Sequence, residues 1–256
     1  MQEVYCVQHC YYEIINNLNN KAMDVEELYR RYAAGERDFS GVALSRANLN
    51  IAKVKSLEDL EAGENDLSGI NLSGASLSSA NLSFVNLSGA NLSSAQLDSA
   101  KLAEANLSGA NFSNASLFSA RLGHSDLSGA DLSGANLDCT DLEYANLSQS
   151  ILRRASIGEA NLSGANLSGA DLTKANFVQT ALCEANLTGA FLRNTNLIEC
   201  SLAGANLTNV DLSEAIICLE LADINRISGA ILCNTTMPDG SIRNDHCQSV
   251  IVETML

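Results

Sequence analysis

The sequence predicts an all-β solenoid, a tube wound from short extended segments that are joined by tight corners. Three observations predict it. A large apolar residue, here called a centre, occupies every fifth position from Leu67 to Ile217, and 27 of these 31 centres are Leu. The residue two places before the centre is Ala in 21 of the 31 units. The residue directly before the centre is Asn or Asp in 20 of them.

A five-residue period fits neither of the regular elements. A helix turns by about 100° per residue, so five steps do not return to the same face. A straight strand has a period of two, and an odd repeat would reverse its faces at every unit. The unit Ala-Asn/Asp-Leu-Ser-Gly instead fits a short extended segment with Ala and Leu pointing inward. Ser-Gly then supplies a two-residue turn in which Gly can adopt a positive φ.

Residues 1–37 lack the repeat, and the sequence predicts two helices there. Asp24, followed three residues later by Glu27, is typical of a helix start, and Gly35 is a stop signal. One face of this helix is apolar and consists of Val25, Leu28, Tyr29 and Tyr32. An earlier helix is expected over about residues 4–18. An open tube end would expose apolar centres and unpaired strand edges, so we interpret residues 1–37 as an N-terminal helical cap.

The repeat is predicted to run from residue 38 to residue 242, with one interruption near its start. Its first three centres are Phe39, Leu44 and Leu49. Register is then lost, because 18 residues separate Leu49 from Leu67. Residues 55–64 carry a helix-start and a helix-stop signal, and we expect a short helical insertion there, over about residues 57–62.

The phase of the repeat continues beyond Ile217, but less regularly. It fails at Ala222, and Glu220 and Asn225 stand where small residues belong, which predicts an irregular coil. Four further positions are in phase and are expected to be centres: Ile227, Leu232, Met237 and Ile242. Residues 243–256 are expected to form a capping tail.

The repeated unit, as in Ala-Asn-Leu-Ser-Gly at residues 160–164 and again at 165–169, resembles the pentapeptide-repeat family. The resemblance covers roughly residues 39–242. It implies a right-handed β-helix with a four-sided cross-section and four pentapeptides per coil, whereas the spacing alone does not distinguish four sides from three. Roughly ten coils at ~4.8 Å would then give a rod about 45–50 Å long. The units are similar to those of cyanobacterial members, and residues 235–242, Thr-Thr-Met-Pro-Asp-Gly-Ser-Ile, are similar to the segment that closes the last coil in many members.

Composition narrows the classes of function. The 256 residues carry a net charge of −15, from 30 acidic and 15 basic residues. This balance argues against sequence-independent nucleic-acid binding, which needs many Lys and Arg on phosphates. No apolar run approaches the ~18 residues of a membrane span, and the N-terminus lacks a secretory signal pattern. We therefore expect a cytoplasmic protein whose eight cysteines are thiols.

The sequence offers no convergent chemical site, so we expect neither an enzyme nor a cofactor. Inward Leu and Ala fill the tube, and the phosphate-loop, dinucleotide and zinc-protease motifs are absent. Cys6, His9 and Cys10 could share a helix face and bind a metal. We favour the simpler interpretation, a buried face on which the thiols act as small hydrophobic groups, and predict no metal site.

Three cysteines near the C-terminus leave a disulfide open. In regular coils Cys218 and Cys233 would lie on neighbouring edges, too far apart for the ~5.5 Å Cα separation of a disulfide. The irregular stretch between them could bring them together, or the tail could fold back and pair Cys233 with Cys247. Free thiols are the favoured alternative.

Residues twenty apart should stack in columns if the coil is four-sided. One outward column becomes acidic and apolar by turns: Asn71, Asn91, Asn111, Asp131, Ile151, Asp171, Phe191 and Asp211. Its adjoining edge carries four of the six basic residues between residues 67 and 217. Apolar groups ringed by Arg and Lys are typical of partner contacts, although scattered substitutions in a drifting repeat are the simpler interpretation. The candidate partner surface consists of Ile151, Arg153, Arg154, Lys174, Phe191 and Arg193.

The leading hypothesis is a non-catalytic interaction or scaffold rod with an unknown protein partner. No nucleic-acid or membrane partner is expected, and the oligomeric state stays open. The family resemblance implies an alternative, because some members linked to quinolone resistance imitate duplex DNA and bind gyrase, a type II topoisomerase. Residues 67–217, however, carry a net charge of only −7, from 13 acidic and 6 basic residues. Duplex DNA carries one charge per ~1.7 Å, so the sparse charge favours the interaction rod.

Overall fold

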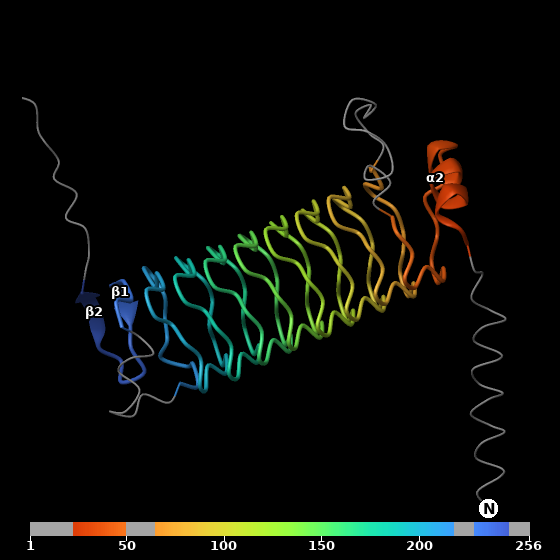
Figure 1. Cartoon of the computed structure of the whole chain (residues 1–256). Coiled ribbons are helices and arrows are strands. Elements are labelled where there is room, and N and C mark those ends of the chain that lie inside the picture. Colours follow the sequence, from red (N-terminus) through yellow and green to blue (C-terminus); the bar gives the residue numbers. More distant parts are fainter. Residues whose placement is uncertain (1–22, 50–64, 218–227, 246–256) are drawn as a thin grey trace, which may run out of the picture.

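The structure is a computed structural model of the chain, and it describes residues 23–49, 65–217 and 228–245. These residues form a rod of stacked coils (Figure 1). The helix α2, Val25–Ala33, lies at one end, and the strands β1, Leu232–Thr236, and β2, Ile242–Asp245, lie at the other. The helices expected over about residues 4–18 and 57–62 fall outside the described residues. The described coils have the β-solenoid architecture that the five-residue period predicts.

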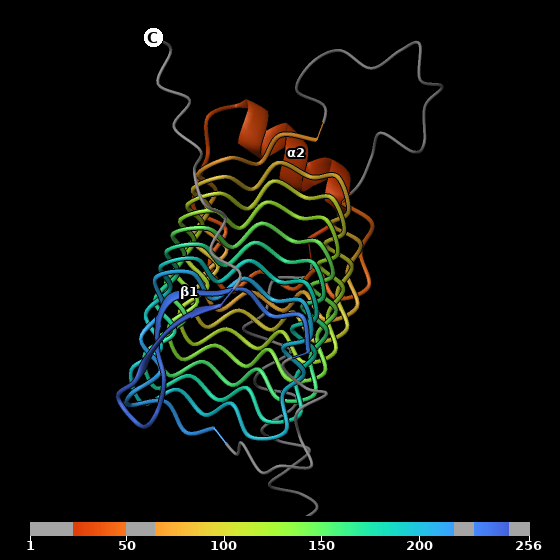
Figure 2. The ribbon, with the colours of Figure 1, turned by 90° about the vertical axis from the view of Figure 1, so that its left-hand side faces the viewer.

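Each regular coil contains twenty residues, or four five-residue units. From the Asp66–Asn86 bridge to the Asn196–Ile216 bridge, residues twenty apart pair in parallel on neighbouring coils. The N–H of a centre donates to the following coil, as from Leu72 to the carbonyl of Asn91 at 2.7 Å. The residue before a centre donates to the preceding coil, as from Asn91 to the carbonyl of Ile70 at 2.9 Å. Backbone hydrogen bonds therefore tie each coil to both neighbours, and successive coils keep similar outlines (Figure 2).

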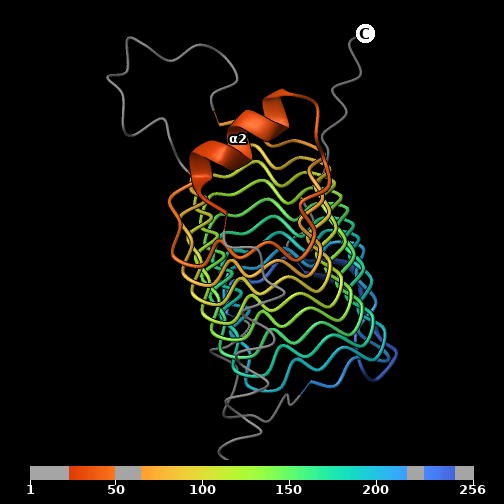
Figure 3. The same ribbon diagram turned by 90° about the vertical axis from the view of Figure 1, so that its right-hand side faces the viewer.

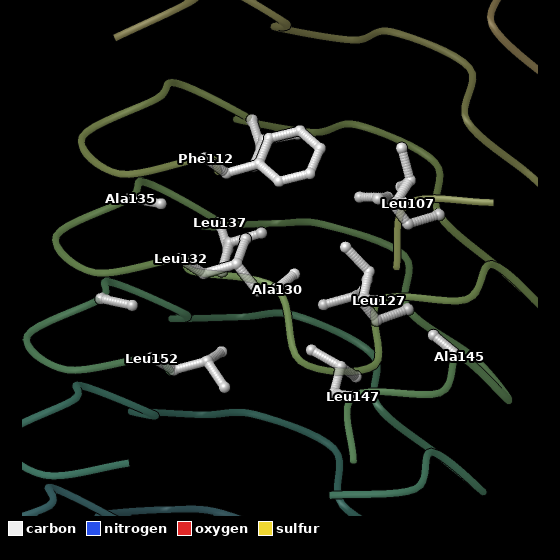
Figure 4. Close-up of a cluster of buried hydrophobic side chains, with 14 of the residues drawn as sticks. Leu107, Phe112, Leu127, Ala130, Leu132, Ala135, Leu137, Ala145, Leu147 and Leu152 are labelled. Carbon is white, nitrogen blue, oxygen red and sulfur yellow. The ribbon is translucent and has the colours of Figure 1, made fainter. Parts of the chain in front are cut away.

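The centres and the small residues fill the interior, as predicted. All centres from Leu67 to Leu212 are at most 3% exposed. Figure 4 shows two of the columns that they form, one of Leu107, Leu127 and Leu147 and the other of Phe112, Leu132 and Leu152. Such packing fills the tube, so any binding chemistry of the described coils belongs on their outer surface.

The corners adopt one shape whether or not they contain glycine. The second residue after the centre has a positive φ in every unit from Gly69 to Asn209, yet only ten of these 29 residues are Gly. The N–H of the next residue donates to the carbonyl of the centre, as from Ala75 to Leu72 at 3.0 Å. This hydrogen bond and this φ are those of a type II turn. The stacked coils thus hold ordinary residues in the left-handed region, at a cost of about 1–2 kcal/mol each.

The Asn and Asp residues before the centres form ladders along the outside of the rod. Asn166 Nδ2 donates to Asn146 Oδ1 at 3.1 Å, and Asn166 Oδ1 accepts from Asn186 Nδ2 at 3.2 Å. The same oxygen accepts from the N–H of Ser168 at 3.2 Å, across the corner. This double role explains why Asn or Asp is preferred directly before the centre. The alternation of inward and outward residues predicts only that this side chain points outward.

Helix α2 begins and ends at the predicted signals and lies across the N-terminal end of the coils (Figure 3). Its N-cap, Asp24, accepts the N–H of Glu27 at 2.6 Å, and Gly35 follows its end with a φ of 95°. Leu28 is fully buried as part of the rod's core. No helix of the described residues is long and apolar enough to cross a membrane.

Two tyrosines fasten α2 to the coils. The hydroxyl of Tyr29 donates to the carbonyl of Leu49 at 2.8 Å, and that of Tyr32 donates to the carbonyl of Ser68 at 2.7 Å. Burial raises the pKa of Tyr29 above its usual range, so this hydroxyl keeps the proton that it donates. The apolar face predicted for this helix is therefore the face that contacts the rod.

The first and last coils depart from the twenty-residue spacing. The Asp38–Asn71 bridge joins residues 33 apart, thirteen more than in a regular coil, in agreement with the loss of register after Leu49. The Asn206–Ile231 bridge joins residues 25 apart. Because the five extra residues equal one unit, the phase survives while the coil is irregular, as the sequence predicts. Ile227 lies outside the described residues.

Ile242 corrects the predicted end of the repeat. It is 61% exposed and lies in β2, so the prediction that it is a centre was wrong. Met237 is still buried, but its N–H donates to the carbonyl of Ser241 at 2.8 Å and its carbonyl accepts from Gly240 at 2.9 Å. This turn reverses the chain, and β2 pairs antiparallel with β1, with Thr236 opposite Ile242.

Candidate partner-binding surface

Two apolar side chains interrupt a polar column on the outside of the rod. Parallel bridges join Asp131, Ile151, Asp171, Phe191 and Asp211 in this order, one residue per coil. Ile151 is 38% exposed and Phe191 is 62% exposed. Neither side chain can join the hydrogen-bonded ladder that Asn and Asp form at this position. The ladder therefore does not explain why these two residues are there.

The four basic residues expected beside this column line one open groove of about 620 Å³. They come from three successive coils and are Arg153, Arg154, Lys174 and Arg193. The rest of the lining is uncharged and consists of Ser113, Asn114, Ser133, Gly134 and Thr173. An acidic chain thus presents a local positive surface.

Two of the four basic side chains are paired with carboxylates. Arg153 Nε donates to Asp171 Oδ2 at 2.5 Å, and Arg193 donates to Glu214 from Nε at 2.7 Å and from Nη2 at 2.8 Å. Burial opposes ionisation of Asp171, but hydrogen bonds from Thr173 and Arg153 outweigh it and lower the pKa of this carboxyl. The bonds from Arg193 likewise lower the pKa of Glu214. Both acids are therefore ionised at neutral pH.

Arg154 and Lys174 have no such partner among the described residues. They occupy the same corner position in neighbouring coils, with φ of 59° and 63°. No ion pair joins either of them to a carboxylate within the described part of the chain. Their two positive charges are available to a molecule that enters the groove.

A second groove, of about 470 Å³, meets the first at Arg193, which lines both. Phe191 supplies its apolar wall, and Asp211 and Glu214 supply acidic groups. Within a few coils, the two grooves together present an aromatic side chain, four basic side chains and two carboxylates.

Five of the six residues predicted for the partner surface line these two grooves. The sixth, Ile151, lines neither groove but lies two coils from Phe191 in the same column. The sequence did not predict the uncharged residues of the groove lining or the ion pair of Glu214 with Arg193. One signal for the pairs is present there: opposite charges lie 18 residues apart in Arg153–Asp171 and 21 apart in Arg193–Glu214, close to the length of one coil.

Residues 23–49, 65–217 and 228–245 contain no group of His, Cys, Asp and Glu side chains that could hold a metal ion. The metal candidates Cys6, His9 and Cys10 lie outside these ranges.

Cys139 and Cys183 are free thiols, but Cys233 is disulfide-bonded, so the expectation of thiols throughout was wrong for Cys233. This disulfide occurs at the irregular end of the repeat, where the sequence left a disulfide open. The two partners considered for Cys233, which are Cys218 and Cys247, lie outside the described residues.

Several solved structures are similar to this chain. HetL, a pentapeptide repeat protein involved in heterocyst differentiation regulation from the cyanobacterium Nostoc sp. strain PCC 7120, is 29% identical, over 86% of this chain and 100% of HetL, with a TM-score of 0.34. A pentapeptide repeat protein from the Arabidopsis thaliana thylakoid lumen is 32% identical, over 46% of this chain and 73% of its own, with a TM-score of 0.24. QnrB1, a plasmid-mediated fluoroquinolone resistance protein, is 18% identical, over 73% of this chain and 95% of QnrB1, with a TM-score of 0.40. No curated protein matches the chain.

A family model for pentapeptide repeats matches more than half of the chain. It finds eight copies, over residues 64–93, 95–134, 115–154, 150–189 and 175–213. These residues are the regular coils in which every fifth side chain is buried and residues twenty apart pair. Members of this family fold as right-handed β-helices, the architecture that the resemblance implied. The chain therefore belongs to the family of pentapeptide repeat proteins.

Proposed function

We propose that this protein is a non-catalytic interaction rod, and that its contact with a protein partner consists of Ile151, Arg153, Arg154, Lys174, Phe191 and Arg193. One observation carries the proposal. Phe191 is 62% exposed at a ladder position, beside a groove lined by four basic side chains. Aromatic residues and Arg are enriched among the residues that dominate protein–protein interfaces.

We propose further that the rod is a four-sided tube that begins at residue 38 and ends near Met237, with residues 1–37 as its N-terminal cap. The chain that follows the turn at Met237 is its tail, in place of the predicted boundary at residue 242. The twenty-residue coil supports four sides, because it contains four corners. The contacts of Tyr29 and Tyr32 support a cap, because they hold α2 against the apolar end of the tube. A rigid rod of this kind holds surface residues at fixed spacings, as a docking surface requires.

A DNA mimic that binds a type II topoisomerase is the alternative, and it has weaker support. The net charge of −7 over residues 67–217 has the required sign. Over about eight coils at ~4.8 Å, it amounts to roughly one charge per 5 Å, against one per ~1.7 Å in duplex DNA. The cationic groove also lies on this part of the rod. A gyrase supercoiling assay tests the alternative, and no inhibition at micromolar protein would remove it.

The partner surface is tested by capture from a lysate of the source organism, followed by mass spectrometry. Phe191→Glu places a charge at the centre of the surface, and we expect it to abolish capture of a partner that the unaltered protein retains. Phe118→Glu is the matched control, because Phe118 is 45% exposed on a different edge of the rod. Circular dichroism and thermal melting verify that both variants keep the fold. Equal capture by the Phe191 variant and the unaltered protein would remove the proposed surface.

A further inference from the structure

The groove lined by the four basic side chains holds a surplus of positive charge. Asp171 neutralises Arg153, and Glu214 neutralises Arg193. Arg154 and Lys174 then contribute about two charges that no ion pair among the described residues offsets. None of the described residues that line the groove is acidic.

The fold does not need these two cations. Arg154 and Lys174 stand at the same corner of neighbouring coils, about 4.8 Å apart along the rod, where like charges repel. Both also hold the left-handed φ that is unfavourable for residues other than Gly. Asn114 and Asn194 occupy the same corner elsewhere in the same column, with φ of 57° and 56°. An uncharged residue therefore suits this corner. The presence of Arg154 and Lys174 in two neighbouring coils requires a reason beyond folding.

The donors of the groove favour a small anion. Gly134, which precedes Arg154 in this column, adds no side chain to the groove, and the side chain of Asn114 lies over its corner, because a Cβ built on Gly134 would be 2.8 Å from Asn114 Oδ1. Three residues that carry a hydroxyl group, Ser113, Ser133 and Thr173, also line this groove. Guanidinium, ammonium and hydroxyl groups all donate hydrogen bonds, and together they suit a ligand that presents several acceptor oxygens.

We propose that this groove binds a phosphorylated serine or threonine of the protein partner. The inference rests on the proposed function, since it names the chemistry that the partner brings to the same surface. A phosphate monoester carries about −1.5 to −2 charges at neutral pH, which matches the two unpaired cations. Arg donates two parallel hydrogen bonds to phosphate oxygens, as it does to a carboxylate, and Lys binds phosphate as a point charge. A polyanion such as duplex DNA is disfavoured, because the chain carries a net charge of −15.

Fluorescence anisotropy with degenerate peptide pools tests this inference. The probe is a labelled pool of nine-residue peptides with phosphoserine at the centre and mixed residues elsewhere, and the comparison pools carry Ser or Glu-Glu there. We expect the full-length protein to bind the phosphoserine pool at least ten-fold more tightly than the Ser pool. Equal binding of the phosphoserine and Ser pools would overturn the inference, and equal binding of the Glu-Glu pool would overturn the assignment to phosphate.

The double variant Arg154→Asn with Lys174→Asn removes both unpaired charges and installs the residue that this corner already carries at Asn114 and Asn194. We expect at least a ten-fold loss of affinity for the phosphoserine pool. Arg121→Asn is the matched control, because it removes one positive charge from a different column that already holds Asn81 and Asn161, and it should leave the affinity unchanged. Unaltered affinity in the double variant would overturn the inference.

The outcome can be separated from that of the proposed function. If Phe191→Glu abolishes partner capture while the double variant keeps it, the partner surface stands and the phosphate inference fails. If the phosphoserine pool binds through Arg154 and Lys174 while no partner depends on Phe191, the phosphate inference stands and the proposed role of Phe191 in the partner surface fails.

Discussion

Arg193 donates two hydrogen bonds to the carboxylate of Glu214, at 2.7 and 2.8 Å, while it lines the groove proposed to bind phosphate. Glu214→Gln keeps the size of the side chain and removes its charge, so a third basic side chain of the groove becomes unpaired. We expect several-fold tighter binding of the phosphoserine pool and a steeper dependence on salt, both measured by anisotropy. Glu159→Gln is the control, because it removes the same charge on another edge of the rod. Unchanged affinity in the Glu214 variant would show that Arg193 does not contact the anion.

Acid should remove the contribution of Asp171 to stability. Hydrogen bonds from Thr173 and Arg153 outweigh the effect of burial and hold the pKa of this carboxyl below its ordinary value. A carboxyl whose pKa is lowered by folding stabilises the folded state above its unfolded pKa of about 3.9, and this contribution disappears as the pH falls through the folded value. Asp171→Asn retains the acceptor for the N–H of Thr173 but loses the ion pair. Thermal melting should show the variant less stable at pH 7, with the difference closing below about pH 4. A difference that is independent of pH would contradict this assignment.

The period of the sequence predicts the interior of the rod because burial depends only on the alternation within one unit. Leu147 and Ala145 could therefore be placed inside without knowledge of any neighbouring coil. The number of units per coil is different, because it depends on hydrogen bonds between residues twenty apart, such as Asn91 and Asn111, and a five-residue spacing contains no record of them. Ile242 shows the converse error. It keeps the phase, but the turn after Met237 decides its direction.

The surface was harder to predict than the interior. Stacking columns places Phe191 and Lys174 near each other, because twenty residues separate successive coils. The direction of a long side chain does not follow from its column, so the sequence did not predict that Arg193 pairs with Glu214 or that Lys174 is without an ion pair among the described residues. The left-handed φ of Arg154 was also missed, since the sequence associates such corners with Gly, whereas the stacked coils impose them on any residue.

The side-chain ladder on the outside of the rod should contribute measurably to stability. Asn166 donates to Asn146 and accepts from Asn186 and from the N–H of Ser168. Asn166→Ala loses all three bonds, and we expect a decrease of about 1–2 kcal/mol in the free energy of unfolding. Asn166→Asp keeps both acceptor roles and should lie between Ala and the unaltered protein. Urea unfolding measures the three values.

Backbone bridges should persist in both variants, because Ala181 occupies the equivalent position of another column and still pairs with Asn161 and Ser201. Equal stability of the Ala variant and the unaltered protein would show that the ladder only accompanies the bridges.

Gly164 is constrained by its neighbour as well as by its φ. It has a φ of 68°, and a Cβ built on it would overlap the ring of Tyr144, which also stacks on His124 with 5.3 Å between ring centroids. Gly89 has a φ of 64° and open space where its Cβ would lie. Gly89→Ala should therefore report the left-handed φ alone, at about 1 kcal/mol, and Gly164→Ala should cost more because the ring of Tyr144 must also move.

The double variant Tyr144→Ser with Gly164→Ala separates the two causes. Serine already occupies this type of corner at Ser94 and Ser99, with φ of 57°, so the first substitution is compatible with the backbone. Once the ring is absent, adding Gly164→Ala should cost only as much as Gly89→Ala. Urea unfolding of the four variants measures this as a coupling between residues 144 and 164. If Gly164→Ala costs the same with and without Tyr144, the ring does not restrict this corner, and the left-handed φ is the sole reason for glycine there.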